Sequence, residues 1–423
     1  MKSNRKKDAN VKLIIFICWL VYTCSYVGKL GYSANIVQIE ACYGISHAQA
    51  GIVGTFFFFA YGGGQIANGI FCKKYNVKYA VFFALLISAI CNLSVALSDN
   101  FSLLKYIWLI NGLALSALWP MLIRFLSEQL DKKDLSKAVF SMGTTVAVGT
   151  FVTYGACALF VFAGNFRLIF YFASVLLPVI AVVWFFLNCK TVARRAGEEK
   201  TEPSGNVTAL QEGGSGKGFV IFVAVLAVFA IVTNLVKDGL TTWIPMILKE
   251  LYYMPDYLSI LLTLFLPVLA IFGTALSMGL HKKIKDFILL CAFLFAVASG
   301  LIVGVAIFSA VSPIVTVVCF SLVSLLMSAT NNVITSMVPL YLKGKTNSGM
   351  LAGIMNGFCY VGSTISAYGL GTVGDDYGWI SVFRLLAVVC GVCVFLASIW
   401  TAGAAFFRRK KKEREEKRDK DQL

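Results

Sequence analysis

Twelve long apolar runs constrain the fold of this chain more than any other feature. Each has about 20–30 residues, enough for a helix rising 1.5 Å per residue to cross a hydrocarbon layer roughly 30 Å thick. Because backbone polar groups in lipid must be satisfied internally, such runs favour helices. The sequence therefore predicts an all-α membrane protein with twelve transmembrane helices. The runs occupy residues 11–39, 47–71, 78–98, 103–127, 136–163, 167–188, 219–248, 257–280, 286–308, 312–341, 347–371 and 379–407.

Composition excludes a soluble protein and, with the positions of the charges, a nucleic-acid partner. Hydrophobic residues make up 58% of the chain and charged residues only 14%, against about a quarter charged in a typical soluble domain. The net charge of +16 lies in short loops and tails rather than in one basic domain. Twelve cysteines are scattered singly, without Cys-x-x-Cys or Cys/His spacing. We therefore expect a lipid bilayer as partner and no metal or other cofactor.

The distribution of basic residues predicts the orientation. Thirty Lys and Arg residues lie in tails and loops on the side of the N-terminus, and four lie on the opposite side. Cytoplasmic loops carry such an excess, so both termini are expected in the cytoplasm of a multi-pass cell-membrane protein. The first run is too long for a signal peptide and is interpreted as a retained helix. The expected units are a first helical bundle (1–188), a Gly-rich linker (189–217), a second bundle (218–407) and a basic tail (408–423), interpreted as a solvated segment that fixes topology.

Two lysines at membrane depth mark the candidate binding site. A lysine at the centre of a spanning helix costs on the order of 2.5–3.5 kcal/mol, so it persists where it faces protein or a water-filled cavity. Lys29 and Lys237 each begin a Lys-x-Gly-x-Ser/Thr pattern, and each lies 18 residues after the start of its run. The two halves of the chain thus repeat one costly feature. We interpret both lysines as substrate contacts of a transporter for a small anionic solute.

Three tyrosines are candidate partners of these lysines. Tyr26 precedes Lys29 by three residues, which places both on one face of a helix. Tyr22 lies one turn earlier on the same helix, and Tyr61 adds a hydroxyl in the second run. Packing is the alternative for any single tyrosine. The shared face favours a cavity role for Tyr26.

Further charged side chains have alternative roles. Asp238 is the one carboxylate placed deep in a run, where it could be a counter-charge to a lysine or carry a coupling proton. Arg124 and Glu128 are spaced i, i+4, which predicts either a local ion pair or a gating contact. His47 and His281 stand isolated at the ends of runs, and we expect them to be solvated.

Several residue sets carry a family resemblance. The six-plus-six arrangement with basic residues in the first and seventh runs resembles the major facilitator superfamily. Within it, the chain is similar to the organophosphate:phosphate antiporter family of glycerol-3-phosphate and hexose-phosphate exchangers. The resemblance implies two pseudo-symmetric six-helix bundles around a central cavity. The matching residues are Tyr22, Tyr26 and Lys29; Lys237, Gly239, Trp243 and Pro245; Trp119, Pro120 and Arg124; and the segment from Gly371 to Trp379.

The chain departs from that family at the site itself. Its two site residues are lysines where the family has arginines, and a lysine is a point charge rather than a rigid two-pronged donor. The run 136–163 has no histidine where the family has one, and the Gly-x-x-x-Asp-Arg signature after the second run reads Gly69-Ile70-Phe71-Cys72-Lys73-Lys74. These departures indicate a different anion or a different coupling.

The sequence therefore predicts a monomeric secondary transporter that moves a small organic anion, a phosphate ester, by alternating access in exchange for phosphate or another anion. One alternative is a proton-coupled symporter for carboxylates or sugar acids, and another is a transporter-like membrane sensor of sugar phosphates. The chain has no Gly-x-x-x-x-Gly-Lys-Ser/Thr motif, which disfavours an ATP-driven pump. No nucleophile, base and orienting residue form a set, so an enzyme is not expected.

Overall fold

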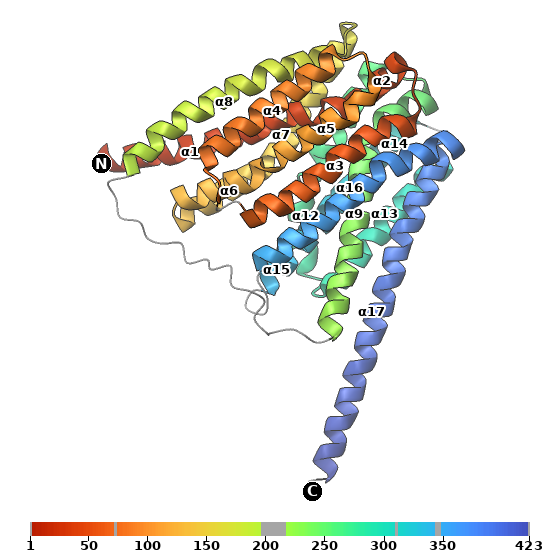
Figure 1. Ribbon diagram of the computed structural model, residues 1–423. Helices are drawn as coiled ribbons and strands as arrows, with labels where there is room; N and C mark the ends of the chain where they lie inside the picture. Colours follow the sequence, from red (N-terminus) through yellow and green to blue (C-terminus); the bar gives the residue numbers. More distant parts are fainter. Residues whose placement is uncertain (1, 72–73, 196–216, 309–311, 343–347, 422–423) are drawn as a thin grey trace.

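The computed structural model describes residues 2–71, 74–195, 217–308, 312–342 and 348–421, and the regular elements in these parts of the chain are helices (Figure 1). The first half contains α1 (Lys2–Ala34), α2 (Ile36–Tyr43), α3 (His47–Phe71), α4 (Val77–Leu97), α5 (Phe101–Ser116), α6 (Leu118–Gln129), α7 (Lys132–Phe162) and α8 (Leu168–Arg195). The second half contains α9 (Lys217–Tyr252), α10 (Asp256–Thr263), α11 (Phe265–Ala270), α12 (Gly273–His281), α13 (Phe287–Phe308), α14 (Pro313–Asn332), the π-helix η2 (Val333–Met337), α15 (Val338–Tyr341), α16 (Ser348–Tyr377) and α17 (Trp379–Asp421).

All twelve predicted runs coincide with helical segments, so the predicted fold class is confirmed. Within the described residues, eleven helical segments are long and apolar enough to cross a membrane. The remaining segment, α16, is 30 residues long but contains seven Gly, three Ser and three Tyr residues, which lower its hydropathy. It packs closely against α3 and α9, where small residues are favoured, while side chains such as Val361 and Ile365 stay exposed.

Four of the runs contain breaks that periodicity does not reveal. The first run ends as α1, and Asn35 separates it from the short α2 while its side-chain amide donates to the Gly31 carbonyl at 2.9 Å. The second break divides α5 from α6 at Ala117, and the eighth run forms the three helices α10 to α12. The fourth is the π-helix η2 in the tenth run. Each break ends a regular α-helical segment inside a predicted run.

Two buried hydrophobic clusters correspond to the two halves. One is built mainly from α1 to α8, around side chains such as Trp108 and Trp184. The other is built mainly from α9 to α17, around Trp243 and Phe383. The predicted linker lies outside the described residues at 196–216, α8 continues to Arg195, and α17 continues through the predicted tail to Asp421.

Helices α3 and α16 form the main contact between the two bundles. A Cβ atom on Gly51 would overlap the Ala367 carbonyl oxygen, and a Cβ atom on Gly62 would lie 2.5 Å from Tyr360 Cβ. Further along the helices, the Asn356 side-chain amide donates to Gln65 Oε1 at 2.6 Å. The glycines therefore allow the two helices to approach closely along much of their length.

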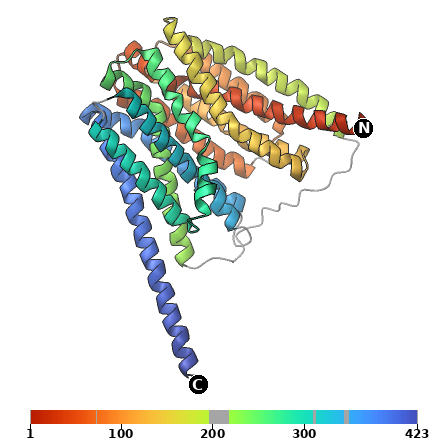
Figure 2. The ribbon, with the colours of Figure 1, turned by 180° about the vertical axis from the view of Figure 1, so that it is seen from behind.

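The bundles are closest at one end of the molecule. We call this the distal end: it holds the end of α9, the start of α3 and the junction of α16 with α17, opposite the two chain termini. Figures 1 and 2 show the bundles together at the distal end and splayed toward the termini. On the other side of the interface from α3 and α16, the rings of Phe162 in α7 and Tyr257 in α10 pack edge to face at 5.3 Å there. The structure is thus closed at its distal end.

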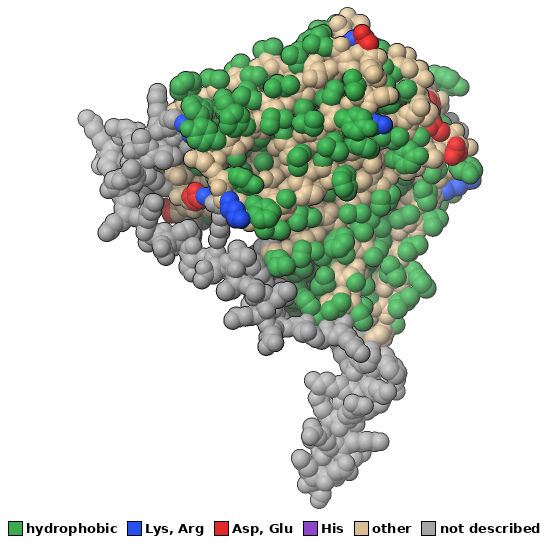
Figure 3. Space-filling model, viewed as in Figure 1, with side chains coloured by type: hydrophobic (Ala, Val, Ile, Leu, Met, Phe, Trp, Pro, Cys, Tyr) green, Lys and Arg blue, Asp and Glu red, His purple; other side chains and the backbone are tan. Residues whose placement is uncertain are grey.

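The surface fits a bilayer. In the space-filling view, hydrophobic side chains cover the visible face of the helical body, and most of the charged side chains lie near its edges (Figure 3). Exposed large apolar residues occur on both bundles, for example Phe140 (81%) and Ile314 (68%). An apolar surface of this kind is far larger than the patches that soluble monomers expose.

Candidate functional site

The α1 backbone is fixed where the first site lysine lies. A Cβ atom on Gly28 would lie 2.8 Å from both Leu177 Cδ1 and Ser88 Oγ, so α1 packs directly on α4 and α8. The Gly28 carbonyl accepts hydrogen bonds from the side-chain amides of Asn92 (3.2 Å) and Asn111 (2.9 Å). Glycine is needed here because any side chain would collide. The packing and hydrogen bonds of Gly28 fix the α1 backbone so that the following residue, Lys29, is directed toward the interface between the bundles.

The Lys29 ammonium group lies among aromatic rings from both bundles. Its Nζ atom is 4.3 Å from the ring centre of Tyr61, 5.4 Å from Tyr26, and 5.9 Å from both Phe57 and Tyr360. Such contacts stabilise a cation by about 0.5–2 kcal/mol each, depending on desolvation. Within the described residues, Lys29 has no carboxylate within 4.0 Å. Its positive charge is thus held in place without being neutralised.

The structure brings together all three tyrosines that the sequence indicated. The hydroxyls of Tyr22 and Tyr61 lie 3.4 Å apart, and the rings of Tyr22 and Tyr26 pack edge to face at 5.6 Å. A fourth tyrosine, Tyr360 of α16, joins these three, and its ring centre lies 5.0 Å from that of Tyr61. Sequence reasoning missed Tyr360, because one tyrosine in an apolar run carries no signal that it meets α1.

Asp238 of α9 faces α16. The Asp238 carboxylate accepts a hydrogen bond from Ser363 Oγ at 2.5 Å, and the Asn234 amide lies 3.5 Å from the same hydroxyl. Within the part of the chain that the structure describes, Asp238 forms no ion pair within 4.0 Å with a lysine. Its role as counter-charge to Lys237 or Lys29 therefore stays a prediction.

Arg124 and Glu128 form the local ion pair that their spacing allows. Arg124 Nε lies 2.6 Å from Glu128 Oε1, and Arg124 Nη1 donates to the Tyr75 carbonyl at 2.9 Å. Both contacts stay within the first bundle: the ion pair lies within α6, and the hydrogen bond to Tyr75 connects α6 to the segment before α4. A gating role for the pair stays a prediction.

The prediction that His47 is solvated is wrong. Its side chain is 13% exposed and has carboxylates on both ring nitrogens. His281 is half-buried and stacks on the Phe287 ring at 4.6 Å. Among the described residues, no group of three or more His, Cys, Asp or Glu side chains has an arrangement that could hold a metal ion.

Comparison with known sequences adds family information. The family model of the Major Facilitator Superfamily matches residues 18–367 and again residues 283–422. A probable hexose phosphate transport protein of Chlamydia trachomatis is 26% identical over 121 residues, which is 29% of this chain and 26% of that protein. The membrane sensor protein UhpC of Escherichia coli is 24% identical over 99 residues, 23% of each chain. The chain thus matches about a quarter of the length of these curated relatives.

Comparison with solved structures concerns the fold. A bacterial homolog of the human lysosomal transporter Spinster, solved in an inward-facing and occupied conformation, superposes with a TM-score of 0.69. The match covers 95% of this chain and 97% of that one at 14% sequence identity. The nucleoside transporter NupG, solved as a point mutant, gives 0.68, with 92% and 99% covered and 14% identity. At such identities the likeness concerns the helical arrangement alone.

Proposed function

The chain belongs to the Major Facilitator Superfamily, and from this we propose that it is a secondary transporter for a small organic anion, specifically a phosphate ester. The observation that carries the proposal is Lys29. It lies where the two bundles meet, its ammonium group contacts rings from both, and no carboxylate among the described residues neutralises it. An unpaired cation at membrane depth is costly unless an anion uses it.

The two lysines give the proposed mechanism. Lys29 belongs to the first bundle and Lys237 to the second. An anion bound between them would therefore interact with a positive charge of each bundle at the same time. Alternating access then consists of the bundles rocking around this fixed site. Two uncompensated ammonium groups in a closing cavity are costly, so the empty carrier reorients poorly. Exchange for phosphate or another anion follows from this cost.

Phosphorylated substrates are supported by the relatives and by the chemistry of the site. The Chlamydia relative is named as a probable hexose phosphate transport protein. An ammonium group binds phosphate as a compact charge, without the paired donors of arginine. Tyr22, Tyr26 and Tyr61 add hydroxyls and ring edges beside Lys29, which suit a polar, ring-bearing ester. These groups form the proposed binding wall of the first bundle.

The proposed orientation places both termini in the cytoplasm. It is supported by the thirty basic residues on the side of the N-terminus against four on the other. The distal end then faces outward, and the closed distal end with splayed bundles corresponds to a carrier open to the cytoplasm (Figure 2).

Counterflow in proteoliposomes tests the proposal. Vesicles loaded with one unlabelled anion are tested for uptake of labelled phosphate, phosphate esters and carboxylates. We expect uptake of a phosphate ester, lost in Lys29→Gln and kept in Lys105→Gln. Lys105 is a matched control, because its ammonium group also lies over a tyrosine ring, that of Tyr106, but on its own helix and away from the interface. Normal counterflow by Lys29→Gln would contradict the proposal.

Two other functions are distinguishable in the same assay. Uptake of carboxylates driven by a proton gradient, without anion on the opposite side, would indicate the symporter. Binding of a sugar phosphate without counterflow would indicate the sensor. The observation that favours a sensor is the match to the membrane sensor protein UhpC over 99 residues.

A further inference from the structure

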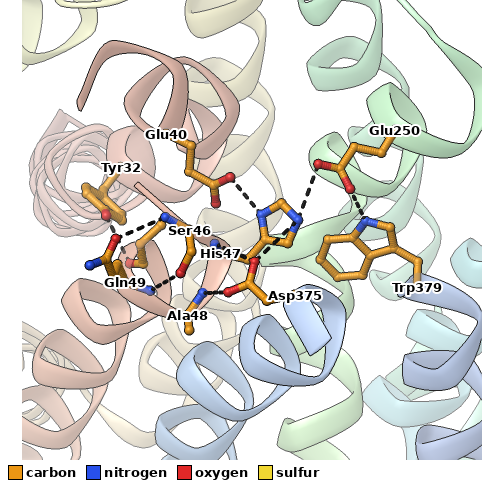
Figure 4. Close-up of polar contacts among 10 residues, drawn as sticks. Tyr32, Glu40, Ser46, His47, Ala48, Gln49, Glu250, Asp375 and Trp379 are labelled. Atoms are coloured by element: carbon orange, nitrogen blue, oxygen red, sulfur yellow. Dashed lines mark hydrogen bonds and ion pairs between the residues drawn. The ribbon is translucent and has the colours of Figure 1, made fainter. Parts of the chain in front are cut away.

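A cluster of charged and aromatic side chains joins the two bundles at the distal end, away from the proposed substrate site (Figure 4). We call it the distal cluster and define it as Glu40, His47, Glu250, Asp375 and Trp379. His47 Nδ1 lies 2.7 Å from Glu40 Oε2, and His47 Nε2 lies 3.3 Å from Glu250 Oε1 and 3.9 Å from Asp375 Oδ1. Trp379 Nε1 donates to the other oxygen of Glu250 at 2.7 Å. His47 is therefore at the centre of three carboxylates.

The cluster also caps a helix across the interface. The backbone N–H groups of His47 and Ala48, at the start of α3, donate to the two oxygens of Asp375 at 3.0 and 2.7 Å. The first N–H groups of a helix lack partners within it, and a carboxylate there also interacts favourably with the helix dipole. Asp375 belongs to α16 of the other bundle. Separating the bundles removes this cap.

The contacts of His47 favour its protonated, imidazolium form. A neutral imidazole donates from one nitrogen only, whereas an imidazolium donates from both. Carboxylates lie on both sides of the ring: Glu40 is hydrogen-bonded to Nδ1, and Glu250 lies within ion-pair distance of Nε2. The ring also packs against Trp243 (5.9 Å) and Trp379 (5.1 Å), and aromatic rings stabilise a nearby cation. The closed arrangement therefore fits a protonated His47.

The cluster is divided between the bundles in an uneven way. Glu40 and His47 belong to the first bundle, whereas Glu250, Asp375 and both tryptophans belong to the second. When the distal end opens, His47 keeps one carboxylate and loses two. A nearby negative charge stabilises the imidazolium, so the open state binds the proton more weakly.

We propose that His47 is a proton-binding site through which protons on the distal side stabilise the closed distal end. The proposal rests on the alternating access proposed above. The closed state binds the proton more tightly than the open state. Protonation therefore stabilises the closed state, and this stabilisation is complete at pH values below the titration midpoint of the open state. The advantage is lost as pH rises through the midpoint of the closed state. Between the two midpoints, the ratio of open to closed molecules should rise by up to about tenfold per pH unit.

The groups that face His47 from each neighbouring element support this assignment. They are Glu40 of α2, Glu250 of α9 and Asp375 of α16, while α17 contributes the uncharged Trp379. Burial raises the pKa of Glu40, and its hydrogen bond with His47 acts in the opposite direction. The other Glu40 oxygen is buried without a hydrogen-bond partner. Glu40 is therefore a second titrating group, and Glu40→Gln must be measured beside the other variants.

Nuclear magnetic resonance of labelled histidine measures the proton site directly. The chain has two histidines, His47 and His281, so ring-labelled protein gives two signals and His281→Gln assigns them. We expect the His47 midpoint to lie above that of a free histidine side chain, about 6.5. Glu250→Gln or Asp375→Asn should lower the His47 titration midpoint by about one pH unit or more, which is the shift typical of losing one opposite charge. Asp256→Asn is the matched control, because Asp256 pairs with Lys249 at 3.1 Å at the same end but within the second bundle.

Distance measurement between spin labels tests the conformational step. Labels attached through noncanonical residues at Ser102 and Tyr253 avoid the native cysteines and place one probe on each bundle at the distal end. We expect the distance to lengthen as pH rises through and above the ordinary histidine range of about pH 5–8, because three carboxylates hold the proton on His47 in the closed state. The shift should be absent in His47→Gln and present in His281→Gln.

Two results would overturn the proposal. One is a His47 midpoint at the value of a free histidine side chain, about 6.5, that is insensitive to Glu250→Gln and Asp375→Asn. The other is a pH-dependent distance that persists in His47→Gln. Neither measurement uses a substrate, so either failure would leave the anion-transport proposal standing, and failure of counterflow would leave these measurements interpretable.

Discussion

Charge at the two lysines, rather than the shape of their hydrogen bonds, should determine binding. Lys29→Gln and Lys237→Gln each remove one positive charge facing the proposed anion. We expect each to weaken binding by about tenfold or more, which corresponds to about 1.4 kcal/mol, whereas Lys→Arg keeps the charge and should leave some binding. Titration of purified protein with the ester identified by counterflow measures this. Unchanged affinity in both Gln variants would mean that the anion binds elsewhere.

The residues of the site were predictable to the extent that they share a helix face. Tyr26 and Lys29 are three apart, and their spacing alone placed them together. Tyr360 and Ser363 could not be predicted, because they reach the site only through the packing of α16 on α3 and α9. His47 was misjudged for the same reason: Asp375 lies 328 residues away in the chain.

At the scale of helices, the close approach of α3 and α16 depends on particular glycines. In an open helix position, Gly→Ala stabilises by about 0.5–1 kcal/mol. We expect that gain for Gly63→Ala, since a Cβ atom there meets nothing within 4 Å. Gly51→Ala should instead destabilise by about 1–3 kcal/mol, because its Cβ atom would overlap the Ala367 carbonyl oxygen. Thermal unfolding in detergent compares the two variants, and equal effects would show that the interface is looser than described.

The positions of the helices were predictable, and their breaks were not. Hydropathy located all twelve runs because a helix that crosses the hydrocarbon layer must be predominantly apolar along its whole length. Asn35 and η2 interrupt helices through local hydrogen bonds that a window average hides. The hydropathy signal was weakest for α16, whose glycines allow close packing on α3 and α9 but contribute little hydropathy.

At the scale of the whole molecule, the basic residues predict the side on which the termini lie. We expect an epitope inserted in the linker 189–217 to be accessible only from the cytoplasm, and one inserted after Asn100 to be accessible only from outside. Asn100 precedes α5 at the distal end, so the two insertions probe opposite faces. Antibody labelling of intact and permeabilised cells measures both. Labelling of the linker in intact cells would contradict the predicted orientation.

The transport cycle of the whole molecule depends on what happens to the lysines when the anion leaves. Attraction between unit charges 4 Å apart is about 4 kcal/mol at an effective dielectric constant of 20 and halves when the distance doubles. In this structure the Asp238 carboxylate is held by Ser363 at 2.5 Å. A change of rotamer toward Lys237 or Lys29 would exchange that hydrogen bond for an internal counter-charge. On the proposed function, the empty carrier would then reorient slowly, and we expect exchange as the main mode and net efflux as a minor one.

Asp238→Asn separates these two modes. The amide still accepts the Ser363 hydrogen bond but carries no charge, so it keeps the local packing and removes the counter-charge. We expect net efflux from loaded vesicles to fall several-fold while exchange of labelled for unlabelled substrate is kept, because in exchange an anion occupies the site whenever the carrier reorients. Ser363→Ala is the matched control: it frees the carboxylate without removing its charge and should leave net efflux unchanged or raise it. Equal loss of both activities in Asp238→Asn would make Asp238 a substrate contact or a structural residue, since a counter-charge is needed only when the site is empty.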